Sequence, residues 1–143
     1  MRFDVERLLR LWTDPLPAGP AAEDAFRELY TDPVTVNGGS LTAADMVTRA
    51  RALQLVFEAP EREVLDLAEA GDKVAVAFKL TGKQIGPLGT SAGVLAPTGK
   101  VLSLRVIDIL TITDGLISEI VMVADELGAL VAIDAARLQS ATG

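Results

Sequence analysis

The sequence predicts one α+β domain over residues 1–143, in which helices precede an antiparallel sheet. Apolar residues recur at helical spacing as far as residue 57 and alternate with a period of two from residue 61 onward. Two turn motifs, Gly71-Asp72 and Asp114-Gly115, separate pairs of alternating segments. With 143 residues, half of them apolar, the chain can bury a substantial core.

The first helix is expected over residues 4–12, with Asp4 as its N-cap. Its apolar residues share one face at helical spacing: Val5, Leu8, Leu9 and Trp12. Residues 13–20 contain three prolines and a glycine, which is typical of a loop. A second short helix is expected over residues 21–30.

A brief strand over residues 34–37 and a turn at Gly38-Gly39 are expected before the third helix. This helix begins at Thr42, and Asp45 three positions later completes the pattern of a capping box. Strands follow over residues 61–68, 73–81, 100–112 and 116–124, and residues 125–138 form a closing helix or helical tail.

Residues 82–99 are rich in Gly, Ser, Thr and Pro, which predicts a long loop. Long loops in compact domains are often functional, so this segment either borders a pocket or is a mobile hairpin tip.

Asp108 is the only charged residue on the apolar face of a predicted central strand. Period-two alternation places it among five aliphatic side chains, those of Leu102, Leu104, Val106, Leu110 and Ile112. A carboxylate in such surroundings is paired, hydrogen-bonded or protonated, because an isolated buried charge is costly. Carboxyl groups with perturbed pKa values are frequent in functional sites, although structural networks perturb them too.

The composition excludes several classes of function. The chain has no cysteine and no histidine, which removes disulfides, thiolate catalysis and the commonest general base and metal ligand. Proton transfer is left to carboxylates, Tyr30, lysines or ordered water. The net charge of −7 and the lack of a basic stripe argue against nucleic-acid binding. No long apolar run or signal-peptide core is present, so we expect a cytoplasmic protein that does not cross a membrane.

Several segments, in order, resemble the SnoaL-like polyketide cyclases of the nuclear transport factor 2-like superfamily. The matching segments are Gly71–Val76 ("GDxVAV"), Pro97–Lys100 ("PTGK"), Asp108–Leu110, Asp114–Glu119 (together a "DIF…DGKIxE" strand pair) and Asp125–Gly128 ("DELG"). The resemblance implies a single SnoaL-like domain with a cystatin-like, cone-shaped fold. In that fold a curved antiparallel sheet packs on N-terminal helices around an apolar pocket, and members commonly form homodimers through the outer face of the sheet.

The superfamily contains several chemistries, and the resemblance disfavours two of them here. Ketosteroid isomerases have an aspartic acid at the position of Asp108, but their general-base aspartate would fall at or beside Gly38. Limonene-type epoxide hydrolases need polar residues where this chain has Phe78, Leu80 and Met122.

The cyclase resemblance implies Asp108 and Asn37 as catalytic residues. Asp108 would act as the base or, when protonated, as a hydrogen-bond donor, and Asn37 would hold a carbonyl or a water. Two alternatives stay open. Asn37 could instead cap the Gly38-Gly39 turn, and the acid/base carboxylate of the family could correspond to Met122 rather than to Asp108.

Strand parity and the implied fold together predict the residues that contact a ligand: Trp12, Thr35, Phe78, Leu80, Leu104, Val106, Leu110, Ile120 and Met122. We therefore expect a protein that binds a small apolar or polyketide-like molecule in an internal pocket. It would catalyse cyclisation, isomerisation or a related proton transfer without a cofactor or metal. The alternatives are a non-catalytic ligand-binding module and a dimerisation scaffold with a filled core.

Overall fold

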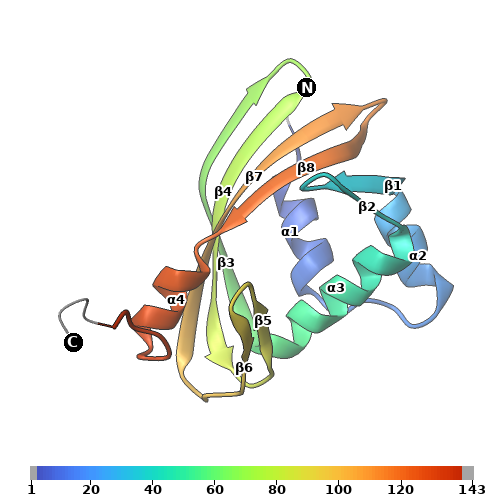
Figure 1. The fold of residues 1–143 in the computed structure, drawn as a ribbon. Helices are drawn as coiled ribbons and strands as arrows, with labels where there is room; N and C mark the ends of the chain where they lie inside the picture. The colour runs from blue at the N-terminus through green and yellow to red at the C-terminus, as the bar shows by residue number, and fades with distance from the viewer. Residues whose placement is uncertain (1–2, 140–143) are drawn as a thin grey trace.

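Three helices from the first half of the chain lie on the concave side of a strongly curved sheet (Figure 1). The computed structural model describes residues 3–139. The helices are α1 (Val5–Thr13), α2 (Pro20–Arg27), α3 (Ala43–Val56) and α4 (Glu126–Ala132). The strands are β1 (Tyr30–Val36), β2 (Gly39–Leu41), β3 (Phe57–Ala70), β4 (Lys73–Gln84), β5 (Leu88–Thr90), β6 (Gly93–Leu95), β7 (Val101–Thr113) and β8 (Leu116–Ala124).

The main sheet has six strands in the order β2-β1-β8-β7-β4-β3, and β5 pairs with β6 in a separate hairpin. The expected α+β class with helices before the sheet is confirmed. The prediction of a purely antiparallel sheet is wrong, because β1 and β8 pair in parallel and make the sheet mixed. The helix α3 and the long strands β3, β4 and β7 lie between β1 and β8 in the chain, and β8 begins at the same end of the sheet as β1.

The predicted helix starts are confirmed by their capping contacts. The Asp4 side chain accepts a hydrogen bond from the Arg7 backbone N–H at 3.0 Å and begins α1. Thr42 and Asp45 form a reciprocal capping box at the start of α3, with bonds of 2.9 and 3.1 Å. Asp125 caps α4 through the Gly128 N–H. These local contacts satisfy backbone donors that a helix leaves unpaired at its first turn.

Several element boundaries differ from the prediction: β1 and β3 begin four residues earlier than expected, and the closing helix α4 ends at Ala132. The second helix ends at Arg27, and Tyr30 already belongs to β1. The predicted loop over residues 82–99 contains the end of β4 and the β5–β6 hairpin. These two hairpin strands have three residues each, which is too short for period-two alternation to be recognised among glycines and serines.

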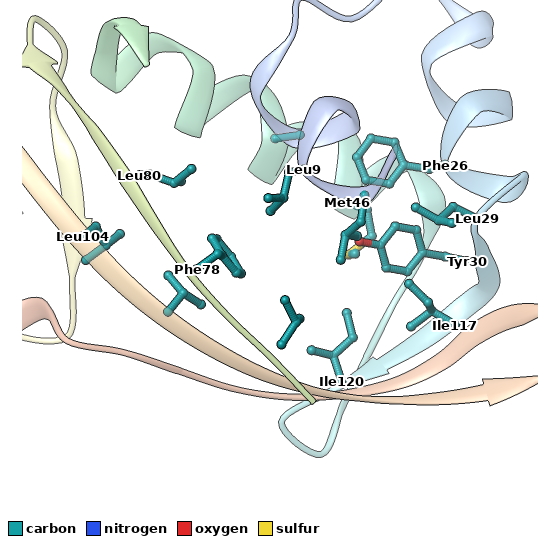
Figure 2. Close-up of a cluster of buried hydrophobic side chains, with 14 of the residues drawn as sticks. Leu9, Phe26, Leu29, Tyr30, Met46, Phe78, Leu80, Leu104, Ile117 and Ile120 are labelled. Atoms are coloured by element: carbon teal, nitrogen blue, oxygen red, sulfur yellow. The ribbon is translucent and has the colours of Figure 1, made fainter. Parts of the chain in front are cut away.

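The core lies between the concave face of the sheet and helices α1–α3. Figure 2 shows Phe78, Leu80, Leu104 and Ile120 from the sheet facing Leu9 and Met46 from the helices. On β7, every even-numbered residue from Leu102 to Leu110 is buried and every odd-numbered one is exposed. The alternation predicted from the sequence therefore holds through the middle of the sheet.

Gln84 organises the segment that follows β4. Its side chain is fully buried and donates from Nε2 to the carbonyl oxygens of Gly86, Leu95 and Ala96 at 3.1–3.3 Å. Its Oε1 accepts from the backbone N–H and the hydroxyl of Thr98, at 3.2 and 2.7 Å. One buried amide thus ties both ends of the β5–β6 hairpin to the sheet.

The contacts of Gln84 predict a large effect of Gln84→Leu. The substitution removes every side-chain bond of this amide and leaves buried partners unsatisfied, so we expect the free energy of unfolding to fall by about 2–4 kcal/mol. Chemical denaturation measures the loss, and hydrogen exchange should show faster opening of residues 85–99. The matched control is Gln54→Leu, which removes a single bond to the Trp12 carbonyl. Equal losses in the two variants would contradict this role of Gln84.

Candidate active site

A cavity of about 270 Å³ lies between the helices and the concave face of the sheet. Its walls come from α1, α3, β1, β2, β4, β7, β8, the β5–β6 hairpin and the start of α4. The lining residues are Leu8, Leu9, Trp12, Thr13, Tyr30, Val36, Leu41, Met46, Arg49, Leu53, Phe78, Leu80, Leu88, Gly89, Leu104, Val106, Asp108, Ile120, Met122, Ala124 and Glu126. Most of them are apolar, so the cavity favours an apolar occupant.

Asp108 and Glu126 are the acidic residues that line the cavity, and Asp108 is the buried one. Its backbone pairs with Val76 of β4 and Met122 of β8, which fixes its position in the central strand. The residue is only 8% exposed, and its Oδ1 has no hydrogen-bond partner within the described part of the chain. Burial raises the pKa of the Asp108 carboxyl from 3.8 to about 6. The group can therefore exchange a proton near neutral pH, which an exposed aspartate does not do.

Tyr30 is a second polar group in the cavity wall. Its hydroxyl oxygen accepts a hydrogen bond from the Trp12 Nε1–H at 2.7 Å, and no described residue accepts the hydroxyl proton. Burial raises the pKa of Tyr30; the Trp12 bond opposes this shift, and the negative charge of Asp108 adds to it. Tyr30 is therefore a neutral hydrogen-bond donor at physiological pH.

Aromatic packing fixes the orientation of Tyr30. Its ring stacks on Phe26 at 5.6 Å, and Trp12 meets Phe26 edge-on at 5.5 Å. Figure 2 shows the Tyr30 hydroxyl pointing away from Leu29 toward the interior beside Met46. Because the ring and the hydroxyl are both held, the donor is oriented before any ligand binds.

Two other polar lining residues already have partners. The Thr13 hydroxyl donates to the Leu9 carbonyl at 2.8 Å and accepts from Arg62 at 2.7 Å. Glu126 accepts from the backbone N–H and the hydroxyl of Ser91, at 3.1 and 2.6 Å, and so ties the hairpin tip to α4. These contacts support the walls of the cavity.

The structure places seven of the nine residues predicted to contact a ligand along the cavity: Trp12, Phe78, Leu80, Leu104, Val106, Ile120 and Met122. Their role in binding stays a prediction. The other two residues lie elsewhere. Leu110 is fully buried in the core, two residues and roughly 7 Å beyond Asp108 along β7. Thr35 does not line the cavity, whereas its neighbour Val36 does, so the predicted face of this strand is wrong.

Asn37, predicted as a catalytic residue, also lies outside the cavity lining. It has a left-handed backbone at φ 49°, and its amide pairs with the backbone of Met122. Oδ1 accepts from the Met122 N–H at 2.8 Å and Nδ2 donates to the Met122 carbonyl at 3.3 Å. The side chain thus extends the β1–β8 pairing past the end of β1, and these contacts leave it a structural role at the turn.

Sequence reasoning missed Tyr30 and Arg49 as cavity residues. Tyr30 is the chain's single tyrosine, but the sequence predicted it at the end of a helix. Arg49 follows Met46 by three positions and precedes Leu53 by four, so helical spacing could have placed it on the same face. For Val36, the alternation with Thr35 and Asn37 already marked the apolar side of the strand.

No helix within residues 3–139 is long and apolar enough to cross a bilayer. Within the same range, no group of three or more potential metal ligands was found.

Solved structures share this fold. A candidate SnoaL-like polyketide cyclase from Jannaschia sp. CCS1 is 27% identical, with a TM-score of 0.67 over 93% of this chain and 92% of the other. TsrD from Streptomyces laurentii is 21% identical, with a TM-score of 0.73 over 94% of this chain and the whole of the other. IdmH, a candidate polyketide cyclase from Streptomyces antibioticus, is 18% identical, with a TM-score of 0.62 over 78% of this chain and 86% of the other.

The sequence comparisons assign the family. No curated protein matches the chain significantly. The family model described as SnoaL-like polyketide cyclase matches residues 7–133, which include all the residues that line the cavity. The chain therefore belongs to the SnoaL-like polyketide cyclase family.

Proposed function

We propose that the protein binds a small apolar or polyketide-like molecule in the cavity and catalyses a proton transfer beside a carbonyl group, with Asp108 as acid and base. The observation that carries this proposal is the Asp108 carboxyl itself. It is buried in an apolar cavity with Oδ1 unpartnered, and its pKa is about 6. A purely structural carboxylate would be expected to have hydrogen-bond partners, because burial without them is costly.

Tyr30 favours catalysis over simple binding. Removal of a proton next to a ketone leaves negative charge on the carbonyl oxygen, and a fixed donor at that oxygen stabilises the enolate. The Tyr30 hydroxyl has a free proton and an orientation held by Trp12 and Phe26. A binding module needs the cavity but no such pair of base and donor.

The proposed reaction needs no reactant other than the bound ligand. The Asp108 carboxylate removes the activated proton, and the electron pair of the C–H bond moves into the enolate held by Tyr30. In a cyclisation, the enolate carbon attacks a second carbonyl of the same molecule and forms a C–C bond. The protonated Asp108 then returns its proton to the new alkoxide. In an isomerisation the proton returns to a different carbon. The apolar walls contribute by holding the two reacting groups together.

The proposal predicts hydrogen–deuterium exchange at the activated methylene of 2-tetralone, a small apolar ketone, as measured by NMR in D₂O. The protein should accelerate exchange over buffer, and Asp108→Asn should reduce this acceleration by at least about 100-fold because the base is lost. Tyr30→Phe should reduce it by roughly 10- to 100-fold because one donor is lost. The rate should rise with pH through about 6, as the carboxylate forms, and then level off.

Asp66→Asn is the control, because this exposed aspartate lies outside the cavity lining. Circular dichroism should show that all variants remain folded. Full exchange activity in Asp108→Asn would remove Asp108 from the mechanism. No acceleration by the wild-type protein would contradict the proton-transfer function.

The raised pKa of Asp108 also predicts how stability depends on pH. The unfolded chain holds this group near its ordinary pKa of 3.8, whereas the folded protein holds it near 6. The folded state therefore binds the proton more tightly, and the free energy of unfolding should fall as pH rises from about 4 to 6. Asp108→Asn should be more stable than the wild type by on the order of 2 kcal/mol at pH 8, with the difference vanishing near pH 4.

Urea unfolding at pH 4 and pH 8 measures this difference, and Asp72→Asn provides the same charge change at an exposed turn. A less stable Asp108→Asn at pH 8 would mean that the carboxylate makes stabilising contacts, and would argue for a structural role.

We further propose that two copies associate through the outer face of the sheet. Ile107 and Val123 are neighbours on this face, as are Ile109 and Val121, and all four are exposed. Arg105 lies at one end of this apolar patch and Glu119 at the other. A two-fold axis between Ile107 and Ile109 would bring the Arg105 end of one copy toward the Glu119 end of its partner.

Val123→Glu places a charge within this outer patch, where the wild-type side chain is 69% exposed. Because burying an unpaired charge is costly, we expect a dimer in the wild type and a folded monomer in the variant, as measured by sedimentation velocity. Val94→Glu, at an equally exposed site on the hairpin, is the control and should leave the dimer intact. A monomeric wild type would contradict this association.

A further inference from the structure

We propose that Arg49 binds a carboxylate on the ligand, so that the preferred ligand is an apolar ketone that also carries an acid group. This inference rests on the proposed function, because it names the class of molecule that the cavity accepts. It concerns a different group of the cavity lining from Asp108: Arg49 is exposed, whereas Asp108 is buried.

The helix places Arg49 in the cavity wall. Met46, Arg49 and Leu53 all line the cavity, at the three- and four-residue spacing that puts side chains on one face of α3. Met46 is buried and Arg49 is exposed, so the guanidinium lies where the apolar wall meets solvent. An arginine can cover apolar surface with its stem while its charged end stays in water.

Several arginines, Arg10, Arg49, Arg105 and Arg137, have no side-chain partner within residues 3–139, but Arg49 is the one that lines the cavity. Arg27 bonds to three carboxylates, Arg62 to Thr13 and Asp14, and Arg51 to the Pro17 carbonyl. Within residues 3–139, no carboxylate lies within 4.0 Å of the Arg49 guanidinium and no side chain or carbonyl accepts a hydrogen bond from it. Its donors are therefore available to a ligand.

Together with Arg49, the other polar groups that line the cavity fit a ligand with both a ketone and a carboxylate. Thr13 and the Oε1 of Glu126 are engaged by neighbours, whereas Asp108 Oδ1, the Tyr30 hydroxyl proton and the Arg49 guanidinium have no partner within residues 3–139. A ketone fits Asp108 and Tyr30, which supply a base and a hydrogen-bond donor. The guanidinium is the only cation among the lining residues, and its planar fork matches the two oxygens of a carboxylate.

The charges around the cavity favour a monoanion. The chain has a net charge of −7, and the other two charged lining residues, Asp108 and Glu126, are acidic. A phosphate dianion would be repelled by these groups with one arginine to offset them. A carboxylate needs a single cation and can remain at the solvent end, away from Asp108.

Two fluorescent probes of nearly the same shape test the inference: 2-naphthylacetate and its neutral counterpart 2-naphthylacetamide. Their dissociation constants are measured by fluorescence titration at low salt and at 0.5 M salt, where the Debye length is about 4 Å. Arg49→Gln should weaken binding of the acid by about five- to tenfold and change binding of the amide by less than about twofold. Arg49→Lys should recover part of the affinity for the acid, and high salt should reduce the wild-type preference for it.

Arg51→Gln is the matched control, because Arg51 lies on the same helix, is not part of the cavity lining and bonds to a backbone carbonyl. It should leave both dissociation constants unchanged. Equal losses for acid and amide in Arg49→Gln, or no preference for the acid in the wild type, would overturn the role of Arg49 and leave the proposed function standing. Failure of both probes to bind the wild-type protein would overturn ligand binding in the cavity and this inference with it.

Discussion

Packing of α1–α3 against the concave face of the sheet is the constraint on which the rest of the molecule depends. Strand alternation gives the sheet one apolar face, and the helices supply the opposing apolar surface. The sheet is strongly curved (Figure 1), and Phe26 and Tyr30 lie together at one end of the buried cluster, away from Leu80 and Leu104 (Figure 2). The cavity lies between the helices and the concave face, and its apolar character follows directly from its being part of the core.

The hydrogen bonding of polar groups differs between the site and the rest of the structure. Gln84 is as buried as any core residue, yet both ends of its amide are bonded, and Asn37 is similarly used by the backbone of Met122. Asp108 departs from this rule, because its Oδ1 is unpartnered and its proton affinity is raised. A buried polar group without a hydrogen-bond partner is typical of a functional position, where the free-energy cost of desolvating the group is offset by its reactivity.

The wall of the cavity at the β5–β6 hairpin is held differently from the wall at the helices. Leu88 and Gly89 line the cavity, and Leu88 packs in the core; polar contacts from Gln84 and between Glu126 and Ser91 hold the rest of the hairpin. Polar contacts of this kind can open and reform with less disturbance than apolar packing. The hairpin wall is therefore held by a combination of polar contacts and the buried Leu88, whereas the walls at α1 and α3 are formed by apolar packing.

Local rules were sufficient to determine much of this molecule from its sequence. The capping signals at Asp4, Thr42 and Asp125, the turns, the strand alternation and the inward position of Asp108 all depend on neighbouring residues, and they appear in the structure as predicted. The tertiary structure alone decided the parallel pairing of β1 with β8 and the meeting of Tyr30, Arg49 and Asp108 around one cavity. These features depend on which distant segments pack together. A periodic pattern reveals which residues share a face, but it does not reveal what that face will contact.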